Sequence, residues 1–258
     1  MYEFVDLNKP AKNNQNNLKT IVNGINLDDT YDIQTLNVTG RGLIAPVNTM
    51  TEKVGTDGSW LDGSYYPARP IIVELLVNFR ADNIRYMFEK LNSEIGTSLV
   101  SLVFTDDLNW KWHAVLNEVL QEKEDSYSQI IELGFLCPDP YKYETKTRST
   151  GKGVVNPRLM YLTKPELIEF TVGEEAEVIR ITNITNGQNI VLKDNFVKGD
   201  RITFDYSNNS IRKIGGGSLL TKLDILSDFE DFSFSGGNQI EVSPAGSDIT
   251  ITYRERSL

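Results

Sequence analysis

The stretch Phe135-Leu136-Cys137-Pro138-Asp139-Pro140-Tyr141-Lys142-Tyr143 decides the fold, because it ends one pattern of strands and precedes another. Its two prolines, Pro138 and Pro140, remove two backbone N–H donors and fix two φ angles, so the preceding sheet cannot continue. The residues that follow, up to Arg158, are polar and include two glycines and a proline. We therefore expect a first domain over residues 1–143, a linker over 144–160 and a second domain over 161–258.

The first domain is predicted to combine one helix with antiparallel strands. Residues 70–79 (PIIVELLVNF) form a nearly continuous apolar run, which is typical of a strand buried on both faces. Further strands are expected at 99–105, 110–119 and 126–136, with hairpin-turn chemistry at 106–109. This order indicates an α+β domain dominated by antiparallel sheet.

The helix lies between the first two of these strands. Its apolar residues recur with a period of 3.6, and they are Ile84, Met87, Phe88, Leu91 and Ile95. Asp82 or Asn83 can cap its first turn, and Gly96 can end it in the left-handed conformation.

The second domain shows short apolar runs that recur roughly every ten residues. About seven strands are expected, at residues 166–172, 177–183, 188–192, 201–205, 210–214, 239–243 and 248–253. The segments between them are rich in Gly, Asn, Ser and Asp, which favour tight turns. Such a series of strands and turns predicts a β-sandwich, so the whole chain is expected to be mainly β.

The first ~60 residues are polar and rich in Asn, Thr and Gly. Alternation over residues 31–38 predicts a half-buried strand, whereas the Asn- and Gln-rich residues 11–19 predict a loop. Residues 43–60 form a long, turn-rich excursion. Two interpretations of it stay open at this point, an arm that reaches a neighbouring subunit and an irregular loop.

The composition excludes several classes of protein. The formal net charge is −10, which argues against specific nucleic-acid binding, because such binding depends on Lys and Arg that neutralise phosphates. A single cysteine, Cys137, excludes an intramolecular disulfide and a cysteine-built metal site. The N-terminal residues lack the pattern of a signal peptide, and no apolar run is long enough for a membrane-spanning helix. We therefore expect no membrane partner.

No combination of residues predicts a catalytic or metal site. His113, the only histidine, lies in an expected strand and suits a packed or surface position, while Cys137 suits a buried, inert thiol. The clearest acidic clusters, Asp106-Asp107 and Asp228-Glu230-Asp231, lie in expected turns, where carboxylates usually bond their own backbone. We assign no catalytic, cofactor-binding or metal-binding residue, and we expect no cofactor and no enzymatic activity.

Two motifs carry a resemblance to a known family. They are Trp60-Leu61-Asp62-Gly63-Ser64-Tyr65-Tyr66-Pro67-Ala68-Arg69-Pro70-Ile71 and the stretch from Phe135 to Tyr143, separated by about 70 residues with a helix and a hairpin between them. In this order they resemble the distal tail proteins of siphophages that infect Gram-positive hosts. The matching residues are Tyr65, Tyr66, Pro67, Arg69, Cys137, Pro138, Asp139, Pro140 and Tyr141. Within the second half, residues 181–187, 198–205 and 236–240 resemble the family's galectin-like sandwich.

The resemblance implies a structural role in the virion, at the distal end of the phage tail, for a protein made in the host cytoplasm. The first domain would form a homohexameric ring that joins the tail-tube protein to the tail-tip or baseplate proteins and lets DNA pass. The second domain would offer a docking surface for receptor-binding proteins. An acidic lumen would repel the DNA backbone, and this would be a function of the negative net charge. Arg69 would pair with an acid at a subunit contact or cap its local turn.

Two other functions compete with this one. A galectin-like sandwich that binds carbohydrate would need an exposed aromatic platform in the second half, where the aromatics are mostly Phe in apolar runs. A cell-wall hydrolase would need two carboxylates at a suitable separation, which 36 Asp and Glu residues always permit. Trp110 and Trp112 share a strand face and are expected to pack in the core rather than at an interface.

Overall fold

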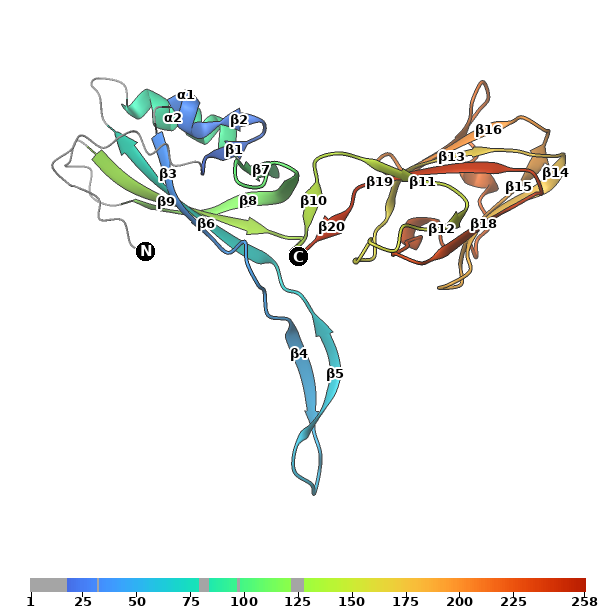
Figure 1. The fold of residues 1–258 in the computed structure, drawn as a ribbon, viewed down its shortest axis with the longest axis horizontal. Coiled ribbons are helices and arrows are strands. Elements are labelled where there is room, and N and C mark those ends of the chain that lie inside the picture. The colour runs from blue at the N-terminus through green and yellow to red at the C-terminus, as the bar shows by residue number, and fades with distance from the viewer. Residues whose placement is uncertain (1–17, 32, 79–83, 97, 122–127) are drawn as a thin grey trace, which may run out of the picture. The chain divides into compact units, whose positions relative to one another are not determined.

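The computed structural model describes residues 18–31, 33–78, 84–96, 98–121 and 128–258. The chain divides into two compact units, which are shown with their elements in Figure 1. The first comprises Met1–Lys142 together with Leu258, and the second comprises Tyr143–Ser257. Strands dominate both units and form antiparallel sheets, so the mainly β fold class predicted from the sequence is confirmed.

The first unit is built on one sheet whose strands follow the order β2-β1-β7-β8-β9-β6-β3. The strands are β1 (Thr20–Val22), β2 (Ile25–Asn26), β3 (Ile33–Thr39), β6 (Arg69–Asn78), β7 (Val100–Phe104), β8 (Trp110–Gln121) and β9 (Ser128–Cys137). Two helices accompany them, α1 (Leu27–Tyr31) and α2 (Ile84–Ile95). The three strands expected after the helix are present as β7, β8 and β9, and the turn at residues 106–109 joins β7 to β8.

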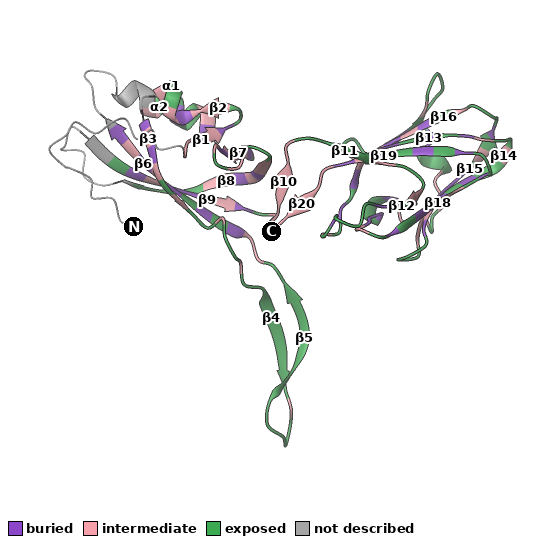
Figure 2. Ribbon diagram, in the orientation of Figure 1, coloured by how far each residue is buried: buried purple, intermediate pink, exposed green. Residues whose placement is uncertain are grey.

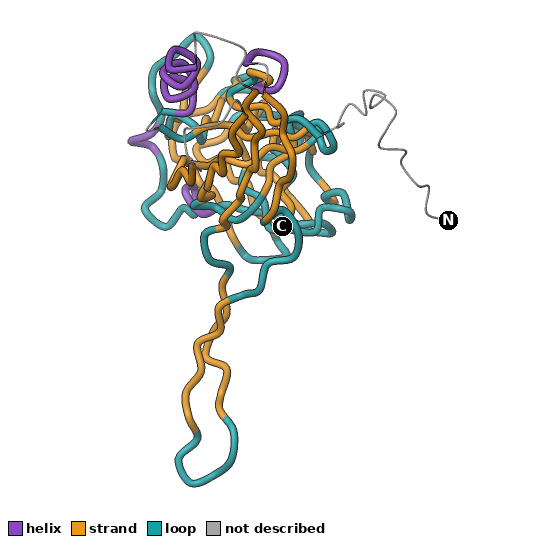
Figure 3. Tube along the Cα trace, turned by 90° about the vertical axis from the view of Figure 1, so that its left-hand side faces the viewer, coloured by secondary structure: helices purple, strands orange, loops and turns teal. Residues whose placement is uncertain are grey.

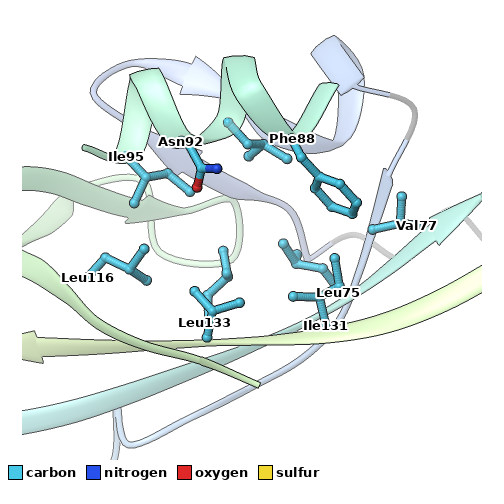
Figure 4. A pocket seen from close by; sticks show the side chains of 10 residues that line it. Leu75, Val77, Phe88, Asn92, Ile95, Leu116, Ile131 and Leu133 are labelled. Atoms are coloured by element: carbon cyan, nitrogen blue, oxygen red, sulfur yellow. The ribbon is translucent and has the colours of Figure 1, made fainter. Parts of the chain in front are cut away.

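Helix α2 covers one face of this sheet, as Figure 4 shows. Leu91 and Ile95 are buried and Phe88 packs beside them, because these positions share the helix face that meets the sheet. Gly96 has a φ of +46° and its N–H donates to the carbonyl oxygen of Asn92 at 2.9 Å, which ends the helix as expected. The expected caps, Asp82 and Asn83, lie outside the described residues.

Strand β6 corrects one expectation. The sequence predicted burial on both faces, but only alternate residues, Ile71, Val73, Leu75 and Val77, are buried. Ile72, on the opposite face, is exposed. The reason is that α2 and the core cover only one face of the sheet. A continuous apolar run is typical of a strand with both faces buried, but here the second face of the strand stays open.

The second unit is a sandwich of two antiparallel sheets around one core. The first sheet has the order β11-β19-β13-β16-β17 and contains β11 (Arg148–Thr150), β13 (Pro165–Thr171), β16 (Arg201–Asp205), β17 (Ser210–Lys213) and β19 (Asp248–Tyr253). The other has the order β12-β18-β14-β15 and contains β12 (Gly153–Val154), β14 (Ala176–Asn183), β15 (Gln188–Phe196) and β18 (Gln239–Ser243). All of the strands expected in this half are present.

Short elements complete the structure. Strands β10 (Lys142–Glu144) and β20 (Arg256–Ser257) pair with each other outside the two sheets of the sandwich, and the 3-10 helices of the second unit are η1 (Leu220–Lys222) and η2 (Phe229–Asp231). Figure 2 marks buried residues on strands of both sheets, and these residues form one core cluster.

Residues 144–160, expected to be a linker, are part of the second unit in the structure. Strand β11 pairs with β19, strand β12 pairs with β18, and Val155 and Leu159 are buried in the sandwich core. The polar sequence does not reveal this role, because strands of two or three residues show no recognisable alternation and their partners lie 85 to 105 residues away.

The excursion at residues 43–60 belongs to a β-hairpin. Strands β4 (Val47–Glu52) and β5 (Ser59–Tyr65) form their own two-stranded sheet, and they run side by side to a loop (Figure 3). Every residue of both strands is exposed, as the uniform colour in Figure 2 shows. We call this hairpin, residues 47–65, the arm.

Candidate assembly site

Arg69 connects the two sequence motifs and the base of the arm. Its side chain is only 1% exposed, although arginine is rarely buried without partners. Nε donates to the carbonyl oxygen of Pro140 at 3.0 Å, and Nη1 donates to the carbonyl oxygens of Gly40 and Gly42 at 2.9 and 2.8 Å. Burial lowers the pKa of this guanidinium from its ordinary value. These three hydrogen bonds correspond to the turn-capping role that the sequence offered for Arg69.

The second motif lies directly beside Arg69. Residue 69 pairs with Cys137 across strands β6 and β9, so the two motifs meet although 68 residues separate them. Cys137 is buried, and burial raises the pKa of its thiol to about 12. The side chain of Asp139 accepts a hydrogen bond from the backbone N–H of Tyr141 at 3.1 Å, which holds the turn between the prolines and β10.

The remaining residues of the first motif stand at the base of the arm. Tyr65 ends β5 and is exposed, Tyr66 is exposed beside it, and Pro67 is half-buried on the way to Arg69. The structure therefore brings Arg69 together with Cys137 and Pro140, while the two tyrosines remain open to solvent.

Gly40 forms the other side of the arm's base. Its φ is +88°, and a Cβ atom added there would lie 2.0 Å from the carbonyl oxygen of Pro70. Only glycine fits this close approach between the end of β3 and the start of β6. Sequence reasoning did not single out Gly40, because a lone glycine after an expected strand is an ordinary turn signal.

The arm carries apolar side chains on both of its faces. Val47 pairs with Tyr65 and Thr51 pairs with Trp60 on one face, whereas the pair Met50 and Leu61 lies on the opposite face, because successive residues of a strand point to opposite faces. Trp60 is 63% exposed, and Lys53 lies over its ring at 4.3 Å. An exposed two-sided hairpin of this kind is marginally stable alone, so its apolar faces suit burial against another molecule.

The acidic clusters are engaged in local contacts. Asp106 accepts two hydrogen bonds from Arg41 at 2.7 and 2.8 Å, and these bonds lower the pKa of its carboxyl group. Asp107 pairs with Lys142 at 2.8 Å. Asp228 accepts a hydrogen bond from the backbone N–H of Asn189 at 2.8 Å. These contacts fit a structural role of the two turns.

In the part of the chain that the structure describes, no three His, Cys, Asp or Glu side chains gather closely enough to hold a metal ion. A cavity of about 190 Å³ lies between α2 and the sheet, where Phe88, Asn92 and Ile95 face Leu133 and Ile131 (Figure 4). Its lining is apolar apart from Asn92, so the cavity offers no group for acid–base or nucleophilic chemistry. None of the described helices is both long and apolar enough to span a bilayer.

Many of the aromatic residues outside the arm pack in the two cores. Trp112 is buried against Phe104, with ring centroids 5.8 Å apart, whereas Trp110 is half-buried under Lys142. In the second unit, Tyr143, Tyr161 and Tyr206 are half-buried and the other aromatic side chains are buried, namely Phe170, Phe196, Phe204, Phe229, Phe232, Phe234 and Tyr253. Tyr206 packs on Phe229 at 4.7 Å, and burial raises the pKa of its hydroxyl. This arrangement does not provide the exposed aromatic platform that sugar binding would need.

Comparison with known proteins defines the class. Residues 161–256, which lie in the second unit, match the family described as "Siphovirus-type tail component, C-terminal domain". The resemblance to siphophage distal tail proteins that the sequence indicated is thereby confirmed, and the chain has the structure of a phage tail hub component.

Two solved structures share the fold. The crystal structure of Dit (gp 19.1) of phage SPP1, described as a paradigm of the hub of the adsorption apparatus in phages that infect Gram-positive bacteria, superposes with a TM-score of 0.76. The match covers 93% of this chain and 99% of that chain at 18% identity. A chain of the phage P2 baseplate, solved in its activated conformation with Ca, matches with a TM-score of 0.52 at 9% identity, covering 91% of this chain and 97% of that one. No curated protein matches at the level of sequence.

Proposed function

We propose that this chain is a distal tail protein whose first unit assembles into a hexameric ring, and that this ring joins the tail tube to the tail-tip or baseplate proteins. The arm is the observation that carries the proposal. It exposes apolar side chains on two faces, and it is anchored at its base by Arg69 and Gly40. An anchored arm that reaches the next subunit makes a head-to-tail contact, and such contacts close into rings when their rotation allows it.

We also propose that DNA passes through this ring, and the negative charge on the open face of the first unit's sheet supports this proposal. Glu74 and Glu132 lie directly opposite each other on β6 and β9, and Glu118 of β8 lies across Gly134 on the same face. Like charges placed opposite each other destabilise a sheet slightly, and within the described residues these three carboxylates have no ion-pair partner. A face of this charge repels phosphates, so we propose that it lines the channel.

The proposed role needs no enzymatic activity and no cofactor. The tail-tube protein and a tail-tip protein would contact the two sides of the ring, and the second unit would bind receptor-binding proteins at the distal end of the virion's tail. We propose residues 1–143 as the ring-forming part and residues 144–258 as the docking part, because residues 144–160 pair within the sandwich, and we propose that the motif residues 65–69 and 137–141 hold the base of the arm.

The assembly is tested by the mass of the purified full-length protein. Light scattering over a range of concentrations should approach about six times the 29.1 kDa chain mass, and negative-stain images should show rings with a central hole. A particle that stays monomeric at every concentration, and also in the presence of purified tail tubes, contradicts the proposal.

A further inference from the structure

The turn Asp224–Ser227 of the second unit presents two aliphatic side chains to water. Ile225 is 97% exposed and Leu226 is 82% exposed. They occupy the two central positions of the turn, where glycine, proline and short polar residues are usual. At such a position the β-branched Ile225 gives the isolated chain neither a core contact nor a favourable backbone conformation. Contact with another molecule would explain its presence.

The turn is held in one conformation. The N–H of Ser227 donates to the carbonyl oxygen of Asp224 at 3.0 Å, and the N–H of Leu226 donates to Oδ1 of Asp224 at 2.9 Å. Two further bonds fix the turn to strand β15: Asp224 N–H to the carbonyl oxygen of Val191 at 2.9 Å, and Val191 N–H to Oγ of Ser227 at 3.1 Å. Binding through a pre-ordered turn loses little conformational entropy.

The same contacts close the edge of the four-stranded sheet. Strand β15 is its last strand, and the backbone N–H of Asn189 donates to the carboxylate of Asp228 at 2.8 Å. The N–H of Asp228 in turn donates to the carbonyl oxygen of Asn189 at 2.8 Å. A partner therefore cannot add a strand over residues 189–191, and recognition here must use the side chains at the tip of the turn.

Charged residues near the turn form ion pairs. Lys193 of β15 pairs with Asp224, and Lys222 pairs with Asp194 at 3.5 Å. An apolar centre beside balanced charges has the anatomy of a protein–protein interface. It does not suit a nucleic acid or an anionic membrane, which require an excess of basic residues.

We propose that Ile225 and Leu226 are the anchor residues by which the second unit inserts into an apolar pocket of a different tail protein. This inference rests on the proposed function, because it names the surface that the docking unit uses. A second copy of the chain is a poorer occupant. A contact between second units of neighbouring copies would have to fit the same rotation between subunits that the arm contact sets in the proposed ring. A different protein does not have to obey this rotation.

The test is site-specific photo-crosslinking in purified virions that contain the full-length chain. Benzoyl-phenylalanine replaces Leu226 in one virion preparation and Val197 in the control, because Val197 is an aliphatic residue of the same unit that is 53% exposed. We expect position 226 to give a crosslink to a different tail protein, identified by mass spectrometry, and position 197 to give none. A crosslink to a second copy, equal crosslinking at both positions or no crosslink at 226 contradicts the inference.

The tail protein identified by crosslinking is then purified separately, and its affinity for the chain measures the contribution of the two anchor residues. The variant Ile225→Ser/Leu226→Ser should lower the affinity at least about 10-fold, whereas the control Val197→Ser/Ile214→Ser should leave it unchanged. All four side chains are exposed, so both variants should keep the thermal unfolding of the parent protein. The copy number of the chain in the same virions separately tests the proposed ring.

Discussion

Nε of Arg69 donates a hydrogen bond to the carbonyl oxygen of Pro140 at 3.0 Å, across 71 positions of sequence. The same guanidinium holds the carbonyl oxygens of Gly40 and Gly42, so one buried side chain fixes the turn after β9 and the segment that leads into the arm. In the proposed ring, these contacts would set the direction in which the arm leaves the first unit.

Replacing Arg69 with alanine should destabilise the first unit by roughly 2–4 kcal/mol, since hydrogen bonds from a charged donor each contribute about 1.5–3 kcal/mol. Tryptophan fluorescence during chemical denaturation follows this unit alone, because Trp60, Trp110 and Trp112 all belong to it. The control is Arg41→Ala, which removes a partly exposed pair with Asp106 and should cost about 1 kcal/mol or less. Equal effects of the two variants would show that Arg69 does not hold the base of the arm.

Replacing Gly40 with alanine should destabilise the first unit by at least about 2 kcal/mol, because the backbone must move away from Pro70 and a non-glycine residue resists a positive φ. Gly42 is the matched control. A Cβ atom there meets nothing within 4 Å, so Gly42→Ala should be close to neutral. The denaturation midpoints of the two variants test this prediction. A Gly40→Ala variant with the midpoint of the parent protein would contradict the close approach between residue 40 and Pro70.

The thiol of Cys137 should not react with a water-soluble thiol reagent in the folded protein at pH 8, and it should react at once in denaturant. Its pKa is raised from 9.0 to about 12 by burial, so above pH 9 the unfolded chain loses a proton that the folded chain keeps. Stability from this group is thus fully present below pH 9 and falls as the pH rises toward 12. The variant Cys137→Ala should show a shallower loss of stability over that range, and an identical slope would contradict the assignment.

The arm should be required for assembly and not for folding. The variant Trp60→Ser/Leu61→Ser removes one large side chain from each face of the hairpin and should raise the concentration at half-assembly at least about 10-fold. Leu108→Ser is the control, since Leu108 is 55% exposed in the turn between β7 and β8. Light scattering measures the assembly and circular dichroism the fold. Normal assembly of the arm variant would exclude the arm as the subunit contact.

Most of the sandwich and helix α2 were predictable from the sequence, because one face of each element packs on a core and leaves a period of 2 or 3.6. The arm strands β4 and β5 gave no such signal, since Met50 and Trp60 are apolar residues on opposite, exposed faces. The contacts of Arg69 were hidden for another reason. Its partners are backbone carbonyls 27 to 71 residues away, and no residue type marks them.

A cryo-electron microscopy map of purified tails that contain this chain tests the central claim most directly. The account predicts a hexameric ring at the distal end of the tube, with each arm in contact with the next subunit and with Glu74, Glu118 and Glu132 facing the channel. A map in which the chain forms no closed ring around the channel, or in which the arms contact no neighbour, would contradict it.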